Sequence, residues 1–286
     1  MAQLPDYDSP SALKAFLEER GMGMQKKFGQ NFLINNSARG KLSEALDVTK
    51  GTTVWEVGPG LGALTSGILE KGGDLTAFEI DRGFGKALES IFADEIKENR
   101  FRLVMGDVLK TWKSYFEKNG TPDRFFGNLP YNVAAVIIGD FISAGLRFEK
   151  SVVTVQKEVG LRMTAKPGSE DYSSFSVLCQ WAYDITPIMD LSGGSFWPRP
   201  NVDSRAVLMT KKENFPNCKD PKHFMQMQRA LFVSRRKTVK NNLATFLSDS
   251  QKADVILQKT GIDPSIRGER LDIETLLHLS DACGEL

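Results

Sequence analysis

The sequence predicts an α/β fold in which a mostly parallel sheet carries helices on both faces, followed by a small helical domain. From residue 53 to about residue 165, short apolar segments alternate with segments of helical periodicity, the pattern of consecutive βαβ units. From Pro221 onward, helical periodicity continues alone. With 286 residues the chain can form one large core and a smaller satellite domain.

The elements of the first domain, residues 1–211, can be placed in order. Its N-terminal arm, residues 1–50, is expected to hold helices at 11–20 and 37–47, with Lys26 and Lys27 between them. Apolar segments bounded by turn residues predict strands at 54–57, 74–80, 101–105, 124–127 and 150–155. A closing pair of strands is expected at 185–191 and 202–209, separated by a corner rich in glycine and proline.

The second domain, residues 212–286, is expected to be helical and is a candidate for binding RNA. Helices are predicted at 221–233, 238–248, 251–260 and 272–282. Its first two helices and the turn between them carry a cluster of cations that could neutralise phosphates: Arg229, Arg235, Arg236, Lys237 and Lys240. The residues alone fit a solvated helix face equally well. Lys26 and Lys27 are further candidates for RNA contacts.

The tetrapeptide Asn128-Leu129-Pro130-Tyr131 follows a predicted strand and is the most informative chemical signal in the chain. The Asn128 side-chain oxygen and the Leu129 carbonyl can accept hydrogen bonds from a planar amino group. Pro130 biases Leu129 towards an extended conformation, which orients that carbonyl. The Tyr131 ring offers a face for an unstacked base, a contact worth about 1–3 kcal/mol. A strand-end turn with a buried tyrosine would look the same, so the tetrapeptide alone does not decide.

A glycine-rich turn and two acids follow three consecutive predicted strands. Gly58, Gly60 and Gly62 alternate after the first strand and precede a helix start, which suits close approach of a ligand. Glu79 ends the second strand, where a carboxylate can accept hydrogen bonds from ribose hydroxyls. Asp107 follows the third strand and could bind an adenine amino group. These positions indicate one crevice for a ligand that contains adenosine.

The nature of that ligand follows from the motifs taken together. The glycine spacing departs from the G-x-G-x-x-G fingerprint, and no arginine after Glu79 is obviously placed for a second phosphate, although Arg82 keeps a dinucleotide possible. The two acceptors for an amino group, the Asn128 side-chain oxygen and the Leu129 carbonyl, favour S-adenosylmethionine as the cofactor.

In order along the chain, these motifs resemble those of the small-subunit ribosomal RNA adenine N6,N6-dimethyltransferases of the kasugamycin-resistance (KsgA) type. The resemblance covers nearly the whole length. The further matching segments are Lys27-Phe28-Gly29-Gln30-Asn31-Phe32-Leu33, Glu56-Val57-Gly58-Pro59-Gly60-Leu61-Gly62, Phe78-Glu79-Ile80-Asp81, Val155-Gln156-Lys157-Glu158-Val159, Phe196-Trp197-Pro198-Arg199-Pro200-Asn201-Val202-Asp203-Ser204 and Arg235-Arg236-Lys237-Thr238.

The resemblance implies a fold, an activity and a set of site residues. The fold is the class I (Rossmann-like) S-adenosylmethionine-dependent methyltransferase fold, a doubly wound sheet with one antiparallel strand. The activity is dimethylation of N6 in two adjacent adenosines of a loop near the 3′ end of small-subunit (16S) rRNA, in ribosome biogenesis. The cofactor-binding residues implied are Asn31, Leu33, Gly58, Gly60, Glu79, Asp107, Val108 and Asn128.

The target base is implied to lie against Asn128, Leu129, Pro130 and Tyr131, with Phe196 as a candidate second aromatic wall. A Phe before a Trp-Pro corner fits core packing equally well. Asn31 stands where many relatives carry His, and it keeps a donor and an acceptor. Direct in-line transfer needs no general base, and Gly127 is expected to leave room for a second methyl group beside N6.

Composition bounds the other possibilities. The net charge is only +1, so an RNA-binding surface must be a local patch. The cysteines and histidines are isolated, which argues against a metal site and agrees with a reducing compartment. No apolar run is long enough to span a bilayer, and the N-terminus lacks the pattern of a signal peptide. A cytoplasmic protein, by default a monomer, is expected.

Other readings stay open at this point. A large-subunit rRNA adenine methyltransferase of the macrolide-resistance type would share the catalytic motifs. A DNA adenine methyltransferase would share the tetrapeptide but should carry its own duplex-recognition domain. A non-catalytic ribosome-assembly or transcription factor can use the same fold, and a nicotinamide-dependent dehydrogenase is a more distant alternative.

Overall fold

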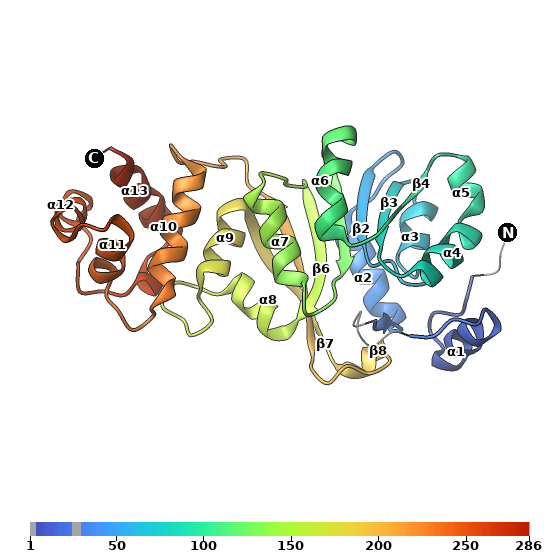
Figure 1. Ribbon diagram of the computed structural model, residues 1–286. Helices are drawn as coiled ribbons and strands as arrows, with labels where there is room; N and C mark the ends of the chain where they lie inside the picture. The colour runs from blue at the N-terminus through green and yellow to red at the C-terminus, as the bar shows by residue number, and fades with distance from the viewer. Residues whose placement is uncertain (1–3, 25–29, 286) are drawn as a thin grey trace. The chain divides into compact units, whose positions relative to one another are not determined.

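The computed structural model describes residues 4–24 and 30–285, which divide into two compact units (Figure 1). The first unit comprises Met1–Phe141, Leu146–Gly160 and Thr186–Thr210. The second comprises Ile142–Gly145, Leu161–Ile185 and Lys211–Leu286. The second unit therefore takes a segment from the middle of the chain in addition to the C-terminal region. Among the described residues, no helix has the length and apolar character needed to cross a membrane.

A seven-stranded sheet, in the order β4-β3-β2-β5-β6-β9-β7, is the main feature of the fold. Its strands are β2 (Thr53–Val57), β3 (Asp74–Glu79), β4 (Phe101–Met105), β5 (Arg124–Asn128), β6 (Lys150–Gln156), β7 (Tyr183–Leu191) and β9 (Ser204–Lys211). The strands from β4 to β6 pair in parallel, and β9 runs antiparallel to β6. The predicted fold, a mostly parallel sheet with an antiparallel strand, is confirmed.

Both faces of the sheet are apolar and covered by helices (Figure 1). Because side chains alternate along a strand, Val54 and Phe126 belong to the core on one face, while Trp55 and Phe125 point to the other. On that second face the Phe125 and Phe148 rings stack with centroids 5.0 Å apart, and the Trp55 ring lies edge-on to Phe148 at 5.9 Å. Aromatic pairs of this kind add about 0.5–1.5 kcal/mol each beyond burial. They contribute to the packing between β2, β5 and the segment just before β6.

Of the helices from α1 to α9, α4 and α6 begin at capping carboxylates. Asp81 accepts from the N–H groups of Gly83 and Phe84, and Asp107 accepts from that of Leu109. The helices are α1 (Pro10–Glu19), α2 (Asn36–Leu46), α3 (Thr65–Glu70), α4 (Arg82–Ile91), α5 (Ala93–Lys97), α6 (Val108–Asn119), α7 (Ala134–Ser143), α8 (Lys157–Thr164) and α9 (Ser174–Ala182). The predicted helices at 11–20 and 37–47 are confirmed, each shifted by one residue.

A small second sheet was not expected from the sequence. Strand β1 (Phe32–Leu33) pairs antiparallel with β8 (Phe196–Trp197), which follows the short helix η2 (Gly193–Ser195). The Phe32 and Trp197 rings stack with centroids 6.1 Å apart. This pairing joins residues more than 160 positions apart in the chain, and it attaches the N-terminal arm to the segment between β7 and β9.

The C-terminal part of the second unit is helical, as predicted. Its core contains Phe224, Met227, Leu243 and Leu276, all fully buried. Side chains of Asp220, Thr238, Asp249 and Asp272 cap the helix starts. Its elements are α10 (Pro221–Val233), α11 (Val239–Leu247), α12 (Ser250–Thr260), the short helix η3 (Gly268–Arg270) and α13 (Ile273–Gly284).

Candidate active site

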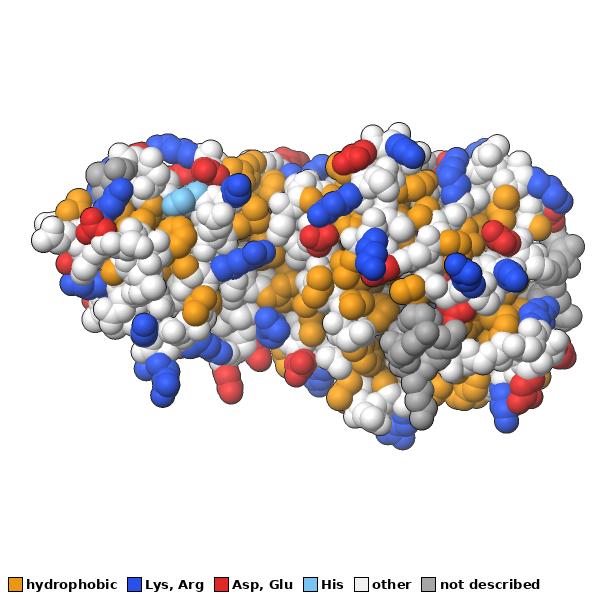
Figure 2. Space-filling view, in the orientation of Figure 1, with side chains coloured by type: hydrophobic (Ala, Val, Ile, Leu, Met, Phe, Trp, Pro, Cys, Tyr) orange, Lys and Arg blue, Asp and Glu red, His pale blue; other side chains and the backbone are white. Residues whose placement is uncertain are grey.

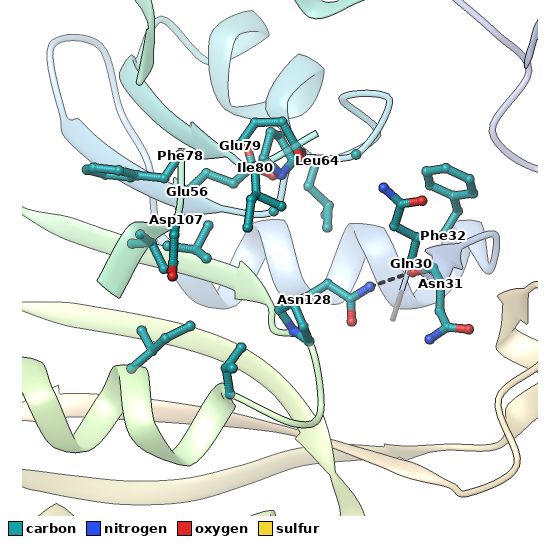
Figure 3. A pocket seen from close by; sticks show the side chains of 18 of the residues that line it. Gln30, Asn31, Phe32, Glu56, Leu64, Phe78, Glu79, Ile80, Asp107 and Asn128 are labelled. Carbon is teal, nitrogen blue, oxygen red and sulfur yellow. Dashed lines mark hydrogen bonds between the residues drawn. The ribbon is translucent and has the colours of Figure 1, made fainter. Parts of the chain in front are cut away.

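A cavity of about 350 Å³ lies at the carboxyl ends of the parallel strands (Figure 3). The strand order reverses between β2 and β5, because β3 and β4 lie on one side of β2 while β5 and β6 lie on the other. Ligands of open α/β sheets bind at this switch point. Gly58 follows β2 and Asn128 ends β5, and both line the cavity. The predicted crevice is therefore present.

The glycine-rich turn forms one wall of the cavity. Gly58, Gly60 and Gly62 all have positive φ, at 70°, 61° and 86°. A Cβ atom on Gly60 would lie 3.0 Å from the Phe32 ring, and one on Gly62 would lie 2.6 Å from the Phe92 ring. Both the backbone conformation and the space therefore require glycine here.

Glu79 lies in the cavity wall with its carboxylate fixed by the backbone. The Asp81 N–H donates to Glu79 Oε1 at 2.8 Å. Burial raises the pKa of Glu79 to about 7 despite this hydrogen bond.

Glu56 is a second buried acid in the cavity wall, and the sequence analysis did not single it out. Thr65 Oγ1 donates to Glu56 Oε2 at 2.6 Å. Burial raises the pKa of Glu56 to about 7, and the nearby Glu79 carboxylate contributes to the rise. A carboxylate just before a glycine-rich turn in an otherwise apolar strand was the signal that could have identified it.

Asp107 completes a set of three acids around the cavity. Its Oδ1 caps helix α6 by accepting from the Leu109 N–H at 3.0 Å, which leaves its other oxygen for a ligand. Val108 lines the cavity beside it, together with Ile80, whose exposed apolar side chain the sequence analysis did not assign.

The charged side chains that line the cavity all have the same sign. Its three charged lining residues, Glu56, Glu79 and Asp107, are all acidic, and no Lys, Arg or His lines it among the residues that the structure describes. The rest of the wall is apolar or carries neutral amides. Such a wall favours a ligand with positive charge and disfavours one with phosphates.

The Asn128 side chain is held in a defined orientation at the carboxyl end of β5. Its Nδ2 donates to the Asn31 backbone carbonyl at 2.8 Å, the dashed line in Figure 3. Because that partner is an acceptor, only the amide nitrogen can face it. The Oδ1 atom therefore points elsewhere, and no described residue donates a hydrogen bond to it. An oriented acceptor is what recognition of an amino group requires.

The arm that supplies Asn31 forms the opposite wall. Asn31, Leu33 and the intervening Phe32 line the cavity, and Gln30 Nε2 donates to Asp81 Oδ2 at 3.3 Å. The pairing of β1 with β8 holds this wall in place. All eight residues that the sequence analysis assigned to the cofactor line this one cavity: Asn31, Leu33, Gly58, Gly60, Glu79, Asp107, Val108 and Asn128.

Comparison with known proteins now identifies the family. Residues 22–283 match the family model of ribosomal RNA adenine dimethylase. The chain belongs to the ribosomal RNA adenine dimethylase family. Residues 4–21, which include the whole of α1, precede the matched range.

Individual relatives agree with this assignment. The ribosomal RNA small subunit methyltransferase A of Treponema denticola is 47% identical over 99% of this chain and 97% of its own. That of Treponema pallidum is 43% identical over 97% of both chains. A crystal structure of a dimethyladenosine transferase from Plasmodium falciparum has a TM-score of 0.72, with 23% identity over 86% of this chain and 94% of its own. This last similarity supports the fold.

Within this family member, the remaining tetrapeptide residues have different places. Pro130 lines the cavity, whereas the Leu129 side chain is 1% exposed and packs inward. A Cβ atom on Gly127 would lie 2.5 Å from Leu129 Cδ2. The expectation that Gly127 leaves room beside the target nitrogen is therefore wrong: the Leu129 side chain fills that space.

The two aromatic candidates for base stacking differ in their surroundings. The Tyr131 ring is half-buried next to the cavity, and its hydroxyl lies 2.6 Å from Ser204 Oγ. Phe196 is 3% exposed, belongs to the main core and does not line the cavity in the described part of the chain. It is a core side chain of β8, the strand that pairs with β1.

The five cations of the second unit that the sequence predicts as RNA contacts fall into two groups. Arg235 Nε donates to Glu269 Oε2 at 2.8 Å, and Lys240 is paired with Asp254 at 2.8 Å. Arg229, Arg236 and Lys237 are exposed, and their side chains have no ion pair with any described residue. Lys26 and Lys27 lie outside the described residues. On the face shown in Figure 2, cations are scattered among neutral and acidic side chains, consistent with the net charge of +1.

Proposed function

We propose that this chain transfers methyl groups from S-adenosylmethionine to N6 of two adjacent adenosines, in a loop near the 3′ end of small-subunit rRNA. The orientation of Asn128 carries the proposal, because its side-chain oxygen is left free beside a cavity suited to a cationic adenosine derivative. The names of the relatives support the choice of rRNA. The substrate would be this rRNA within a ribosomal small subunit or its precursor. The enzyme would act as a monomer, in the cytoplasm.

The acidic wall supports S-adenosylmethionine over a nicotinamide dinucleotide. A pyrophosphate is stabilised by cations or by a helix N-terminus, and here three carboxylates would oppose it. When bound, S-adenosylmethionine supplies a methyl group on a sulfonium centre. Glu79 would accept from the ribose hydroxyls, Asp107 from the adenine amino group, and the wall from Asn31 to Leu33 would contact the methionine end.

Asn128 and Leu129 would activate the target nitrogen. The lone pair of an exocyclic adenine nitrogen is delocalised into the ring, so N6 is a weak nucleophile. Two acceptors, Asn128 Oδ1 and the Leu129 carbonyl, favour a more tetrahedral nitrogen whose lone pair faces the methyl group. Tyr131 would hold the extruded base by stacking. The proton leaves to water once the nitrogen has become cationic, so positioning and electrostatics supply the rate.

Methyl transfer to isolated ribosomal subunits tests the function directly. Small subunits from a strain that lacks the gene should accept labelled methyl groups from S-adenosylmethionine, and primer extension on both rRNAs should stop at two neighbouring adenosines of the small-subunit rRNA. A stop in large-subunit rRNA would instead indicate an enzyme of the macrolide-resistance type. Absence of transfer to either rRNA would favour a binding factor.

Cofactor affinity should increase with pH between about pH 6 and pH 8. The pKa values of Glu56 and Glu79 are both raised to about 7, so each acid is partly protonated in the free protein. A cationic ligand favours the ionised carboxylates, and binding should release protons. Isothermal calorimetry in buffers of different ionisation enthalpy measures this release. An affinity that is independent of pH would contradict the acidic-wall argument.

The same shifts predict the pH dependence of stability without ligand. The ordinary carboxyl pKa is 4.5, so between 4.5 and about 7 the folded protein retains protons that the unfolded chain has lost. The free energy of unfolding should therefore fall as pH rises through this window. The variant Glu56→Gln should show a smaller fall than the wild type, measured by thermal denaturation.

Of the five cations predicted to contact RNA, the three that have no ion pair with a described residue should contribute most to RNA affinity. Replacing Arg229, Arg236 and Lys237 together by Gln should weaken binding to small subunits and lower the salt slope by about 2–3, close to one per phosphate contact. The matched control replaces Arg235 and Lys240, which are already paired with carboxylates and should change the slope less. Equal effects of the two variants would show that ion pairing within the protein does not determine which cations bind RNA.

A further inference from the structure

The segment before the family match packs against the glycine-rich turn of the cavity. The hydroxyl group of Tyr7 donates to the Leu61 backbone carbonyl at 2.9 Å, across 54 positions of the chain. Leu61 lies within the turn, between Gly60 and Ala63, both of which line the cavity. A side chain that is far in sequence from the catalytic motifs therefore contacts the backbone of the glycine-rich turn, which forms one wall of the cavity.

This part of the turn depends on tertiary contacts for its conformation. Leu61 lies between Gly60 and Gly62, whose φ values are 61° and 86°. Glycine populates many backbone conformations, so a peptide with glycine on both sides loses much entropy when it is ordered. The Gly62 N–H donates to the Pro59 carbonyl at 2.9 Å, which closes the turn locally. The Tyr7 hydrogen bond fixes the centre of the turn from outside.

A second contact joins the same segment to the opposite wall. Arg39 forms an ion pair with Asp8, next to Tyr7, and its Nη1 donates to the Leu33 carbonyl at 2.8 Å. Leu33 belongs to β1 and lines the cavity. Residues 7 and 8 thus contact the glycine-rich turn directly and the β1 wall through Arg39.

The Tyr7 side chain is suited to act as a permanent donor. Its ring packs against the main core. Burial raises the pKa of the Tyr7 hydroxyl well above its usual value, and the nearby Glu56 carboxylate raises it further. The hydroxyl therefore stays protonated and can donate to Leu61 throughout the neutral range.

We propose that Tyr7 is a positioning residue of the cofactor site, which holds the glycine-rich turn in its binding-competent conformation through the Leu61 carbonyl. The proposal rests on the proposed function in one respect, that S-adenosylmethionine is the ligand of this cavity. Without the hydrogen bond, the turn would populate the competent conformation for a smaller fraction of the time. The apparent Kd equals the Kd of the competent conformation divided by that fraction, so the apparent Kd would rise.

The variant Tyr7→Phe tests the proposal, because it removes the hydroxyl group and retains the ring. We expect the Kd for S-adenosylmethionine, measured by calorimetry, to rise about three- to tenfold, the effect of one net hydrogen bond. The KM for S-adenosylmethionine should rise in parallel, while kcat at saturation and the KM for small subunits stay near the wild-type values. Hydrogen exchange of residues 58–64 in the ligand-free protein should become faster.

The variant Ser9→Ala is the matched control. Ser9 Oγ caps α1 by accepting from the Ala12 N–H at 3.2 Å, so its loss weakens the same segment without touching the turn. We expect Ser9→Ala to lower the melting temperature but to leave the Kd and the exchange of residues 58–64 unchanged.

Three outcomes separate the possibilities. A Tyr7→Phe protein with wild-type Kd and wild-type exchange at the turn would overturn the proposal. Equal effects of Ser9→Ala and Tyr7→Phe would also overturn it, because general loosening of the segment would then be the cause. If the wild type fails to bind S-adenosylmethionine, the proposed function is lost, and the exchange experiment still decides whether Tyr7 holds the turn.

Discussion

Replacing Asn128 with alanine should lower the rate of methyl transfer by about 10²-fold or more, while S-adenosylmethionine still binds. The side-chain oxygen is an acceptor oriented by the Asn31 carbonyl, and removal of one positioned polar group from a reacting centre has an effect of about this size. Single-turnover transfer of labelled methyl groups to small subunits measures the rate, and calorimetry measures cofactor affinity. The Kd should rise by no more than about tenfold, because the variant loses one hydrogen bond between protein groups, from Asn128 Nδ2 to the Asn31 carbonyl.

Two further variants make this experiment specific. Asn119→Ala removes an exposed amide that donates to the Tyr115 carbonyl at the end of α6, and it should transfer methyl groups at the wild-type rate. Asn128→Asp keeps an acceptor but loses the donor to Asn31, so its rate should lie between those of the wild type and Asn128→Ala. Turnover near the wild-type level in Asn128→Ala would exclude this residue from the activation of N6.

Replacing Glu79 with glutamine should raise the Kd for S-adenosylmethionine by about 10- to 100-fold. Hydrogen bonds to a charged group contribute about 1.5–3 kcal/mol, and the carboxylate is already oriented by the Asp81 N–H, which donates to its Oε1 atom. An amide in its place cannot accept this bond and bonds from two ribose hydroxyls equally well. The rate at saturating cofactor should change much less than the Kd, because Glu79 would not contact the target base.

Asp74→Asn is the matched control for Glu79→Gln. Asp74 begins β3 and Glu79 ends it, so both variants convert an acid to an amide on one strand. Only Glu79 lines the cavity, and Asp74→Asn should bind S-adenosylmethionine as the wild type does. An unchanged Kd in Glu79→Gln would remove the ribose assignment, whatever the result for Asn128.

Much of the site was predictable because its residues follow the ends of parallel strands. Apolar segments of the right length placed β2, β3, β4 and β5, and the carboxyl ends of parallel strands meet at one edge of a sheet. Gly58, Glu79, Asp107 and Asn128 each end or follow such a strand. Their convergence on one cavity therefore follows from topology.

Other features depended on contacts between distant parts of the chain. No pattern in the sequence predicts the pairing of β1 with β8, the hydrogen bond between Asn128 and Asn31, or the contact from Tyr7 to Leu61. Each joins segments more than 50 positions apart, and no local pattern encodes such a pair. Gly127 was misread for the same reason, since only packing shows that Leu129 occupies the space beside it.

By itself, the sequence determined the order and type of the main elements and which side chains face the crevice. These follow from hydrophobic periodicity and from the alternation of side chains along a strand. The tertiary structure alone decided how those side chains are oriented and charged: which atom of Asn128 is free, that Glu56 and Glu79 have raised pKa values, and which cations of the second unit are unpaired. Orientation and ionisation depend on burial and on hydrogen-bond partners, which exist only after distant segments have packed together.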